Sequence, residues 1–358
     1  MKEIRILAIN PGSTSTKIAV FQDTEPIFLK NIKHSSEDLE PFHKINDQFH
    51  FRKNVIVNQL NEAGISEENV RVVMGRGGLL KPIPSGVYEV NELMIHDLNN
   101  SPLGEHASNL GGLIAHDLVQ SLPNAKAYIA DPIVVDEMDD IARIAGHPLF
   151  ERLSIFHALN QKAVARIYSK SIGRNYEDLN LIIAHMGGGV SVGAHNKGRV
   201  IDVNNALNGD GPFSPERTGG LPAGQLVNLC FSGKYSQAEL LTMITGKGGM
   251  VAYLGTNNFI DVSKMADAGN QYAILIRNAV GYQIGKEIGA MASVLHGKVD
   301  GIILTGGMAY QKTLIANIRS MVEYIAVIVV YPGEDELKAL AFNGLLALDG
   351  KIEIKTYS

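Results

Sequence analysis

The feature that most constrains the fold is a strand, a tight polar or glycine-rich turn and a second strand, which occurs twice in the chain. The first copy covers residues 4–21 with its turn at 10–17, and the second covers 179–195 with its turn at 185–189. Short apolar stretches separated by turns rich in Gly, Ser and Thr predict β-hairpins. The two copies start about a domain length apart. The sequence therefore predicts two α/β domains built on one plan.

The spacing of the remaining apolar residues predicts where helices and further strands lie. Helices are expected at 49–63, 103–122, 154–172, 223–231, 236–245, 271–296 and 337–348, and strands at 126–133, 299–304 and 325–330. With 358 residues, the chain is long for one hydrophobic core. We expect an N-terminal domain at 1–155, a C-terminal domain at 156–335 that binds nucleotide and forms the dimer, and a segment 336–358 that packs back on the first domain.

The composition is that of an ordinary globular protein and excludes several classes. Apolar residues make up 45% and charged residues 19%, and the net charge of -5 is spread along the chain. Without a basic stripe, no nucleic-acid partner is expected. A single cysteine, Cys230, excludes an intrachain disulfide and a cysteine zinc cluster, and suits a reducing compartment. Only four apolar residues precede the first turn, and no apolar run could span a bilayer, so we expect a cytoplasmic protein with no membrane partner.

The first turn has the composition of a phosphate-binding loop. Main-chain N–H groups and hydroxyls can surround phosphate oxygens, and a lysine can add positive charge. The residues concerned are Gly12, Ser13, Thr14, Ser15 and Lys17. The loop lacks the GxxxxGK[ST] pattern of a Walker A motif. The alternative is a plain hairpin turn, because Ser, Thr and Gly are common turn residues.

Two further glycine clusters favour the nucleotide interpretation. Gly187, Gly188 and Gly189 remove side chains where a polyanion could approach the backbone closely. Gly306 and Gly307, followed by Met308, come directly after the predicted strand 299–304 and could approach a base and ribose. Three such clusters, each after a strand, point to a nucleotide bound in a cleft between the two halves.

The combined motifs resemble the acetate and butyrate kinase family over nearly the whole chain. The matching patterns are Asn10-x-Gly12-Ser13-x-Ser15-x-Lys17, His185-x-Gly187-x-Gly189 and Gly306-Gly307. The resemblance implies two duplicated ribonuclease H-like, actin-like ATPase domains with an interdomain cleft. It also implies ATP/ADP and Mg²⁺ as cofactors, and direct, reversible phosphoryl transfer to a carboxyl group.

The resemblance also implies roles for individual residues. Arg76 and Arg217 match two active-site arginines, one for the substrate carboxylate and one for the phosphoryl oxygens. His157 and His185 match histidines that face the transferring phosphoryl group, and Asp131 matches a catalytic aspartate. Because a carboxylate substrate needs no deprotonation, we expect Asp131 to organise Mg²⁺ water or an arginine.

Metal, adenosine and acid contacts complete the expected site. Asn10 and a late glutamate match magnesium-side residues; the alignment favours Glu336 and leaves Glu334 open. Asn258 and Phe259 match a segment near adenine and ribose, although the usual Asp and Arg of that segment are missing. The residues after Arg76, Gly77 and Gly78, resemble the butyrate branch of the family, as does Gly188 in place of an asparagine.

These inferences predict a kinase that converts ATP and butanoate to ADP and butanoyl phosphate, and a homo-oligomer, dimeric or larger. Three alternatives stay open at this point. One is a kinase for acetate, propionate or branched-chain acids. Another is a non-catalytic nucleotide-binding regulator on the same fold. The third is a sugar or polyol kinase, which would require Asp131 to act as a general base.

Overall fold

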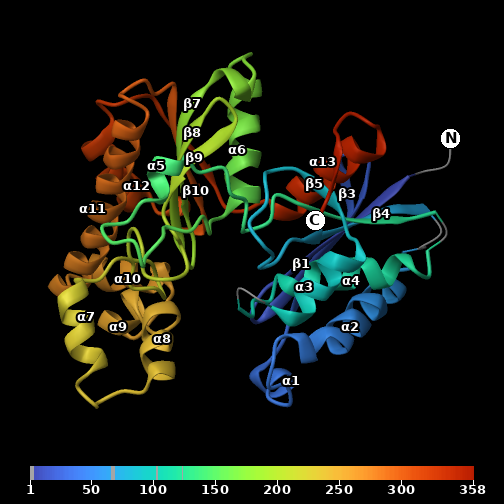
Figure 1. The fold of residues 1–358 in the computed structure, drawn as a ribbon, viewed down its shortest axis with the longest axis horizontal. Helices are drawn as coiled ribbons and strands as arrows, with labels where there is room; N and C mark the ends of the chain where they lie inside the picture. The colour runs from blue at the N-terminus through green and yellow to red at the C-terminus, as the bar shows by residue number, and fades with distance from the viewer. Residues whose placement is uncertain (1–3, 66–68, 102–103, 123) are drawn as a thin grey trace. The chain divides into compact units, whose positions relative to one another are not determined.

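The structure, a computed structural model, describes residues 4–65, 69–101, 104–122 and 124–358 and divides into two compact units (Figure 1). Unit 1 contains the chain up to Val135 together with Asp335–Ser358, and unit 2 is Asp136–Glu334. The first change of unit comes before residue 155 because the segment that follows Asp136 joins unit 2. The Asp139 N–H donates to Ile201 O within that unit.

Unit 1 is built on a seven-stranded sheet in the order β12-β5-β6-β4-β1-β2-β3. The strands are β1 (Arg5–Pro11), β2 (Ser15–Gln22), β3 (Glu25–Lys33), β4 (Val70–Arg76), β5 (Val87–Glu89), β6 (Lys126–Ala130) and β12 (Ile354–Thr356). Strands β1, β2 and β3 form an antiparallel meander, whereas β4 and β6 run parallel to β1. The predicted first hairpin is confirmed.

Helices cover both faces of this sheet because the side chains of a strand alternate between faces. The helices are α1 (Ser36–Leu39), α2 (Phe49–Glu62), α3 (Glu92–Asn100), α4 (Asn109–Val119) and α13 (Glu336–Leu348), with a 3₁₀ turn at Asn46–Gln48. Leu7 and Ile9 pack in one core with α2, α3 and α4. On the other face α13 lies on β1 and β4, where a Cβ at Gly344 would lie 3.1 Å from Cγ2 of Ile6.

Unit 2 is built on a five-stranded sheet in the order β11-β10-β7-β8-β9. The strands are β7 (Asn180–Met186), β8 (Val190–Asn196), β9 (Arg199–Val203), β10 (Gly301–Gly306) and β11 (Ile328–Pro332). Here β7, β8 and β9 form the antiparallel meander, and β10 and β11 run parallel to β7. This repeats the order β6-β4-β1-β2-β3 of unit 1, so the predicted duplication is confirmed.

Helices also sandwich the second sheet. They are α5 (Asp140–Arg143), α6 (Ala158–Ser171), α7 (Ala223–Cys230), α8 (Gln237–Thr245), α9 (Gly249–Leu254), α10 (Phe259–Asp267), α11 (Gln271–Val294) and α12 (Lys312–Val322), with 3₁₀ turns at Tyr176–Asp178 and Gly307–Tyr310. Leu181 and Ile183 pack against α6, and Ile182 and Ala184 pack in the core with α11 and α12. Within the ranges described, no helix combines the length and apolarity that a membrane span requires.

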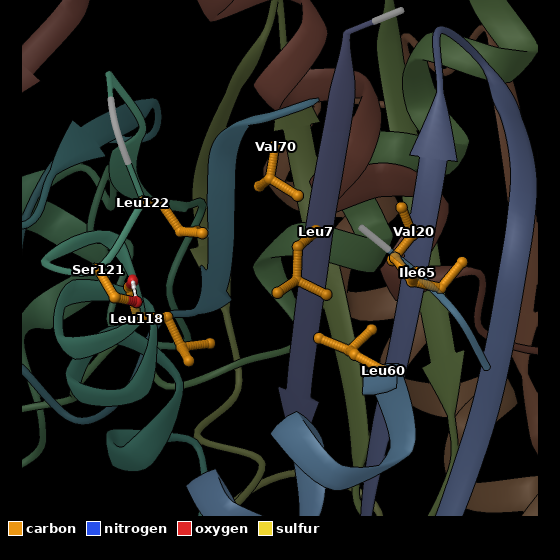
Figure 2. A pocket seen from close by; sticks show the side chains of 8 residues that line it. All are labelled: Leu7, Val20, Leu60, Ile65, Val70, Leu118, Ser121 and Leu122. Carbon is orange, nitrogen blue, oxygen red and sulfur yellow. Dashed lines mark hydrogen bonds between the residues drawn. The ribbon is translucent and has the colours of Figure 1, made fainter. Parts of the chain in front are cut away.

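A small apolar cavity lies in the core of unit 1, and Figure 2 shows its lining. The lining residues are Leu7, Val20, Leu60, Ile65, Val70, Leu118, Ser121 and Leu122. All except Ser121 are apolar, and none is a predicted site residue. The cavity is therefore a packing defect of the core rather than a candidate site.

Candidate functional site

The strand order of unit 1 gathers three predicted site residues at one edge of the sheet. Because β1, β4 and β6 are parallel, their carboxyl ends meet there. Ile9 pairs with Gly75 and Arg76 pairs with Ala130. Asn10 and Arg76 are therefore neighbours, and Asp131 follows at the end of the next strand.

Asn10, Arg76 and Glu336 form one polar cluster at this edge. The Asn10 side-chain amide donates to Glu336 Oε2 at 2.5 Å. Arg76 Nη2 lies 3.1 Å from Glu336 Oε1, and Arg76 Nη1 donates to Asn10 Oδ1 at 3.3 Å. Glu336 is the first residue of α13 and is buried, because that helix packs on β1 and β4. The cluster assembles residues from three distant parts of the sequence.

The cluster also separates the two glutamates left open by the sequence. Glu336 shares unit 1 with Asn10, whereas Glu334 lies in unit 2 and contacts His185. One carboxylate and one amide oxygen form a hard oxygen donor set that fits a magnesium ion retaining most of its waters. Glu336, and not Glu334, is therefore the glutamate that lies beside Asn10.

Asp131 is tied into the backbone of unit 1. Its Oδ1 accepts hydrogen bonds from Ser85 Oγ at 2.6 Å and from the Gly86 N–H at 2.9 Å. The residue is buried and has a positive φ of 40°, which holds the chain in a tight turn after β6. At least one carboxylate oxygen therefore serves the local structure.

Arg52 of α2 contacts the predicted phosphate-binding loop, which the sequence did not reveal. Its buried guanidinium donates from Nη1 to Gly12 O at 2.8 Å and to Ser15 O at 3.1 Å, and from Nη2 to Ser13 O at 3.0 Å. Burial lowers the pKa of Arg52 to about 10. An arginine within a helical pattern gives no sequence signal for a contact with a loop so far away in the chain.

These bonds turn the carbonyls of the 12–15 loop inward, and the Thr14 carbonyl accepts from the His34 N–H at 2.9 Å. Within the described chain, the N–H groups of Ser13 and Thr14 make no hydrogen bond. Both residues are exposed, as is Lys17 on β2. The loop thus presents backbone donors and a cation to solvent, as a phosphate-binding turn requires.

The glycines after Arg76 have a packing function in addition to any effect on the acid site. A Cβ at Gly77 would collide with the Pro132 side chain. At Gly78 it would lie 2.6 Å from Cα of Asn109. Close approach of this loop to the 132 turn and to α4 therefore explains both glycines.

In unit 2, two histidines stack on one another. His185 lies near the end of β7 and is fully buried, whereas His157 precedes α6 and is half-buried. Their ring centroids are 3.8 Å apart with an interplanar angle of 10°. His185 Nδ1 lies 2.8 Å from Asn160 Oδ1, and its Nε2 lies 3.0 Å from Glu334 Oε1. The pair forms a rigid imidazole surface.

The glycine turn between β7 and β8 is joined to the segment that carries Arg217. Ser214 Oγ donates to Gly188 O at 2.5 Å, and Arg217 Nη1 donates to Ala206 O at 2.5 Å. A Cβ at Gly189 would collide with the Arg217 guanidinium, whereas at Gly188 the nearest atom would be 4.0 Å away. Gly189 therefore makes room for Arg217, and Gly188 is exposed.

Some of the residues predicted to bind adenosine are buried in the core of unit 2, and others are exposed. Asn258 caps α10 through a hydrogen bond from the Ile260 N–H at 3.0 Å, and Phe259 is buried in the core of unit 2. Met308 is also a core residue, whereas Gly307 is exposed. Gly306 has a φ of 89°, and a Cβ there would collide with the Met186 backbone. Asn258 and Gly307 are the exposed members of this set, whereas Phe259 and Met308 are buried.

The fold of this chain resembles those of solved kinase structures. The structure resembles an acetate kinase from Porphyromonas gingivalis, with a TM-score of 0.77 at 20% identity over 96% of this chain and 100% of that one. It also resembles a propionate kinase from Francisella tularensis, with a TM-score of 0.76 at 16% identity over 95% of this chain and 98% of that one. The two units therefore have the actin-like ATPase fold of these solved structures.

Sequence comparison narrows the class to one family. The model of the Acetokinase family matches residues 149–331. The chain is 56% identical over 355 residues to Butyrate kinase 2 of Clostridium acetobutylicum, and 54% identical over 353 residues to Butyrate kinase 1 of the same organism. Each comparison covers 99% of both chains. The chain belongs to the acetokinase family.

Proposed function

We propose that the protein is a butyrate kinase, which catalyses the reversible reaction of ATP and butanoate to ADP and butanoyl phosphate. The observation that carries the proposal is the 56% identity, over 99% of both chains, to a protein named Butyrate kinase 2. In the reaction the bond from the γ-phosphorus to ADP breaks as a bond to the carboxylate oxygen forms. No proton is transferred, because the acid is already ionised at neutral pH.

The residues of both units suit that chemistry. Phosphoryl transfer depends on positioning and on charge stabilisation rather than on a general base. We propose that Arg217 and His157 stabilise the transferring phosphoryl group and that the N–H groups of the 12–15 loop bind phosphate oxygens. Arg76 would hold the acid, because a guanidinium fork matches a carboxylate bidentately. One nitrogen of that fork, Arg76 Nη2, lies 3.1 Å from Glu336 Oε1.

Magnesium fits the same proposal. Asn10 and Glu336 would hold the ion, which supplies positive charge to the phosphate oxygens when it is bound. Asp131 would then organise its surroundings, since Ser85 and Gly86 already hold one of its oxygens. This makes Asp131 a poor general base, so a sugar or polyol kinase is the weaker alternative.

We expect the enzyme to discriminate between acids of different chain length by degree. One methylene is worth about 1–3 kcal/mol in an apolar pocket, so neighbouring chain lengths should react more slowly rather than not at all. A hydroxamate assay with ATP, Mg²⁺ and a panel of acids from acetate to valerate tests the proposal. We expect the highest kcat/KM with butanoate. An optimum at acetate would overturn the choice of acid, and ATP binding without hydroxamate from any acid would favour the non-catalytic regulator.

We further propose that the protein works in the cytoplasm as a homo-oligomer assembled through unit 2. Several apolar side chains on and beside α7 are exposed in the single chain: Leu221, Val227, Phe231 and Tyr235. Light scattering at micromolar concentration tests the assembly. A monomeric mass would overturn it.

A further inference from the structure

A chain of hydrogen bonds runs through the interior of unit 2 to His157. We call it the histidine relay; it consists of Tyr176, His195, Gln161 and Ser191. Tyr176 Oη lies 2.6 Å from His195 Nδ1, and His195 Nε2 lies 2.9 Å from Gln161 Oε1. Gln161 Nε2 donates to Ser191 Oγ at 2.9 Å, and Ser191 Oγ lies 2.9 Å from His157 Nδ1. His195, Gln161 and Ser191 are fully buried.

The direction of the relay is fixed by one main-chain atom. Gln161 Nε2 also lies 3.1 Å from Ser191 O, and a carbonyl oxygen can only accept. The Gln161 NH₂ group must therefore face Ser191, and its Oε1 must face His195. Because Oε1 only accepts, His195 Nε2 carries a hydrogen and donates it.

The hydrogen bond between Tyr176 and His195, at the end of the relay far from His157, fits this direction. Burial, reinforced by the charge of Lys162, lowers the pKa of His195 well below its usual range, so the ring is neutral. A neutral imidazole with hydrogen on Nε2 must accept at Nδ1. The Tyr176 hydroxyl therefore donates to it. A Cβ at Gly193 would lie 2.7 Å from Gln161 Oε1, so the absence of a side chain there leaves room for the relay.

At the downstream end, the Ser191 hydroxyl has one hydrogen to give. Its oxygen accepts from Gln161, and the His157 main-chain N–H also faces it at 3.5 Å. Among the described residues, the acceptor that remains for the Ser191 hydrogen is His157 Nδ1. A neutral His157 that accepts at Nδ1 carries its own hydrogen on Nε2.

We infer that the histidine relay locks His157 in the tautomer that presents an Nε2–H donor. The use of that donor rests on the proposed function, in which His157 stabilises the transferring phosphoryl group. The opposite tautomer would present a lone pair to anionic oxygens and would repel them. Gln161, Ser191 and His195 are thus positioning residues that act through His157.

The decisive variant is Gln161→Glu. A carboxylate at this position cannot donate to Ser191, so the Ser191 hydroxyl turns to donate to it. The Ser191 oxygen then faces His157 Nδ1 as an acceptor, and the hydrogen of His157 moves to Nδ1. The matched control is Asn160→Asp, which makes the same amide-to-acid change one residue earlier on α6, where the side-chain oxygen lies 2.8 Å from His185 Nδ1.

The tautomer is measured directly by two-bond ¹⁵N–¹H correlation spectra of ¹⁵N-histidine-labelled protein, at a pH where the ring is neutral. A His157→Gln spectrum assigns the signals. We expect a single Nε2–H tautomer of His157 in the unsubstituted protein and in Asn160→Asp, and Nδ1–H in Gln161→Glu. An Nδ1–H signal in the unsubstituted protein, or an unchanged tautomer in folded Gln161→Glu, would overturn the relay. If Gln161→Glu does not fold, the spectrum of the unsubstituted protein decides.

Kinetics separate the relay from the role of His157. Loss of one preorganised donor costs on the order of 10²-fold in kcat. We expect that loss in Gln161→Glu, with the KM values for ATP and acid changed less than about 3-fold, because uniform binding is retained. A switched tautomer with unchanged kcat would show that transfer does not use the His157 donor, and would overturn that part of the proposed function while the relay stands.

Discussion

At the scale of single residues, Arg52 shows how a buried cation can shape a loop without touching a ligand. Three of the five atoms that accept its hydrogen bonds are main-chain carbonyls of the 12–15 loop, and no ion pair joins it to a carboxylate in the described chain. Burying an unpaired guanidinium is costly, and this is reflected in its lowered pKa. The burial of Arg52 is therefore unfavourable by itself, but it holds the 12–15 loop with its backbone N–H groups facing outward.

Replacing Arg52 tests this account. Arg52→Met keeps the length of the side chain but leaves the three carbonyls without a donor. We expect a loss in the free energy of unfolding on the order of 3 kcal/mol and a KM for ATP raised about 10-fold, because each unsatisfied buried group costs about 1–3 kcal/mol. Denaturant unfolding and steady-state kinetics measure the two effects.

The neighbouring residue provides the control. Lys53→Met removes the same charge from the same helix, but Lys53 forms only a surface ion pair with Asp117 at 3.0 Å. Such pairs contribute at most about 1 kcal/mol. Equal effects of the two substitutions would show that Arg52 acts through charge alone and not through the loop.

The sequence predicted site residues only where a local pattern marked them. Asn10 and Arg76 were predicted from family motifs; they lie at the carboxyl ends of β1 and β4, and the parallel topology brings them together. Arg52, Ser191 and Gln161 were not predicted, because their contacts depend on the tertiary packing of α2, α6 and β8. Phe259 matched a family segment, yet its side chain is in the core.

At the scale of secondary structure, the turn between β7 and β8 determines where Arg217 can lie. Its three glycines are not equivalent: only Gly189 abuts the guanidinium, and only Gly188 is open to solvent. A polar turn between two strands was predictable. The different demands on its glycines depend on a segment nearly thirty residues later and were not.

Alanine substitutions at Gly189 and at Gly188 test separately what each position requires. In Gly189→Ala the new methyl group displaces the Arg217 guanidinium, and we expect kcat to fall on the order of 10²-fold with the fold retained. In Gly188→Ala the nearest protein atom to the methyl group is 4.0 Å away and Arg217 keeps its place, so kcat should change less than about 3-fold, whereas the KM for ATP should rise because the methyl group narrows the predicted nucleotide contact. The hydroxamate assay with butanoate measures both, and circular dichroism checks the fold. Equal rates would remove Arg217 from the reaction.

Elements were predicted best where their pattern was long or repeated. Both hairpins, α2, α6, α11 and α13 are found within a few residues of their expected positions. The predicted helix 103–122 begins outside the described residues at 103, and the structure has α4 only at Asn109–Val119. Helices α3 and α12 and strands β3 and β9 were not predicted, although the buried residues of α12, Leu314, Ile318 and Val322, recur at helical spacing.

At the scale of the whole molecule, each unit buries a histidine that resists protonation. Burial, and then the charge of Arg52, lower the pKa of His34 in unit 1. Burial, and then the charge of Lys162, lower that of His195 in unit 2. Below the ordinary pKa of 6.5, the unfolded chain therefore binds more protons than the folded chain at both positions.

The sign of the pH dependence follows from this difference. A base whose pKa is lowered by folding destabilises the folded state as the pH falls through 6.5, by up to about 1.4 kcal/mol per pH unit for each proton. We expect the free energy of unfolding to fall between about pH 7 and about pH 5.5. In His34→Asn the slope should be smaller, because only His195 remains. Urea unfolding at several pH values measures the slope; an identical slope in the variant would contradict the assignment.

The split composition of unit 1 has a consequence for biosynthesis. Unit 2 is one uninterrupted stretch and leaves the ribosome complete, whereas unit 1 lacks α13 and β12 until Asp335–Ser358 has been made. Until then, the face of β1 and β4 that α13 covers lacks its helix. Glu336 belongs to that later segment, so Asn10 and Arg76 acquire their carboxylate partner only after the whole of unit 2 has been made.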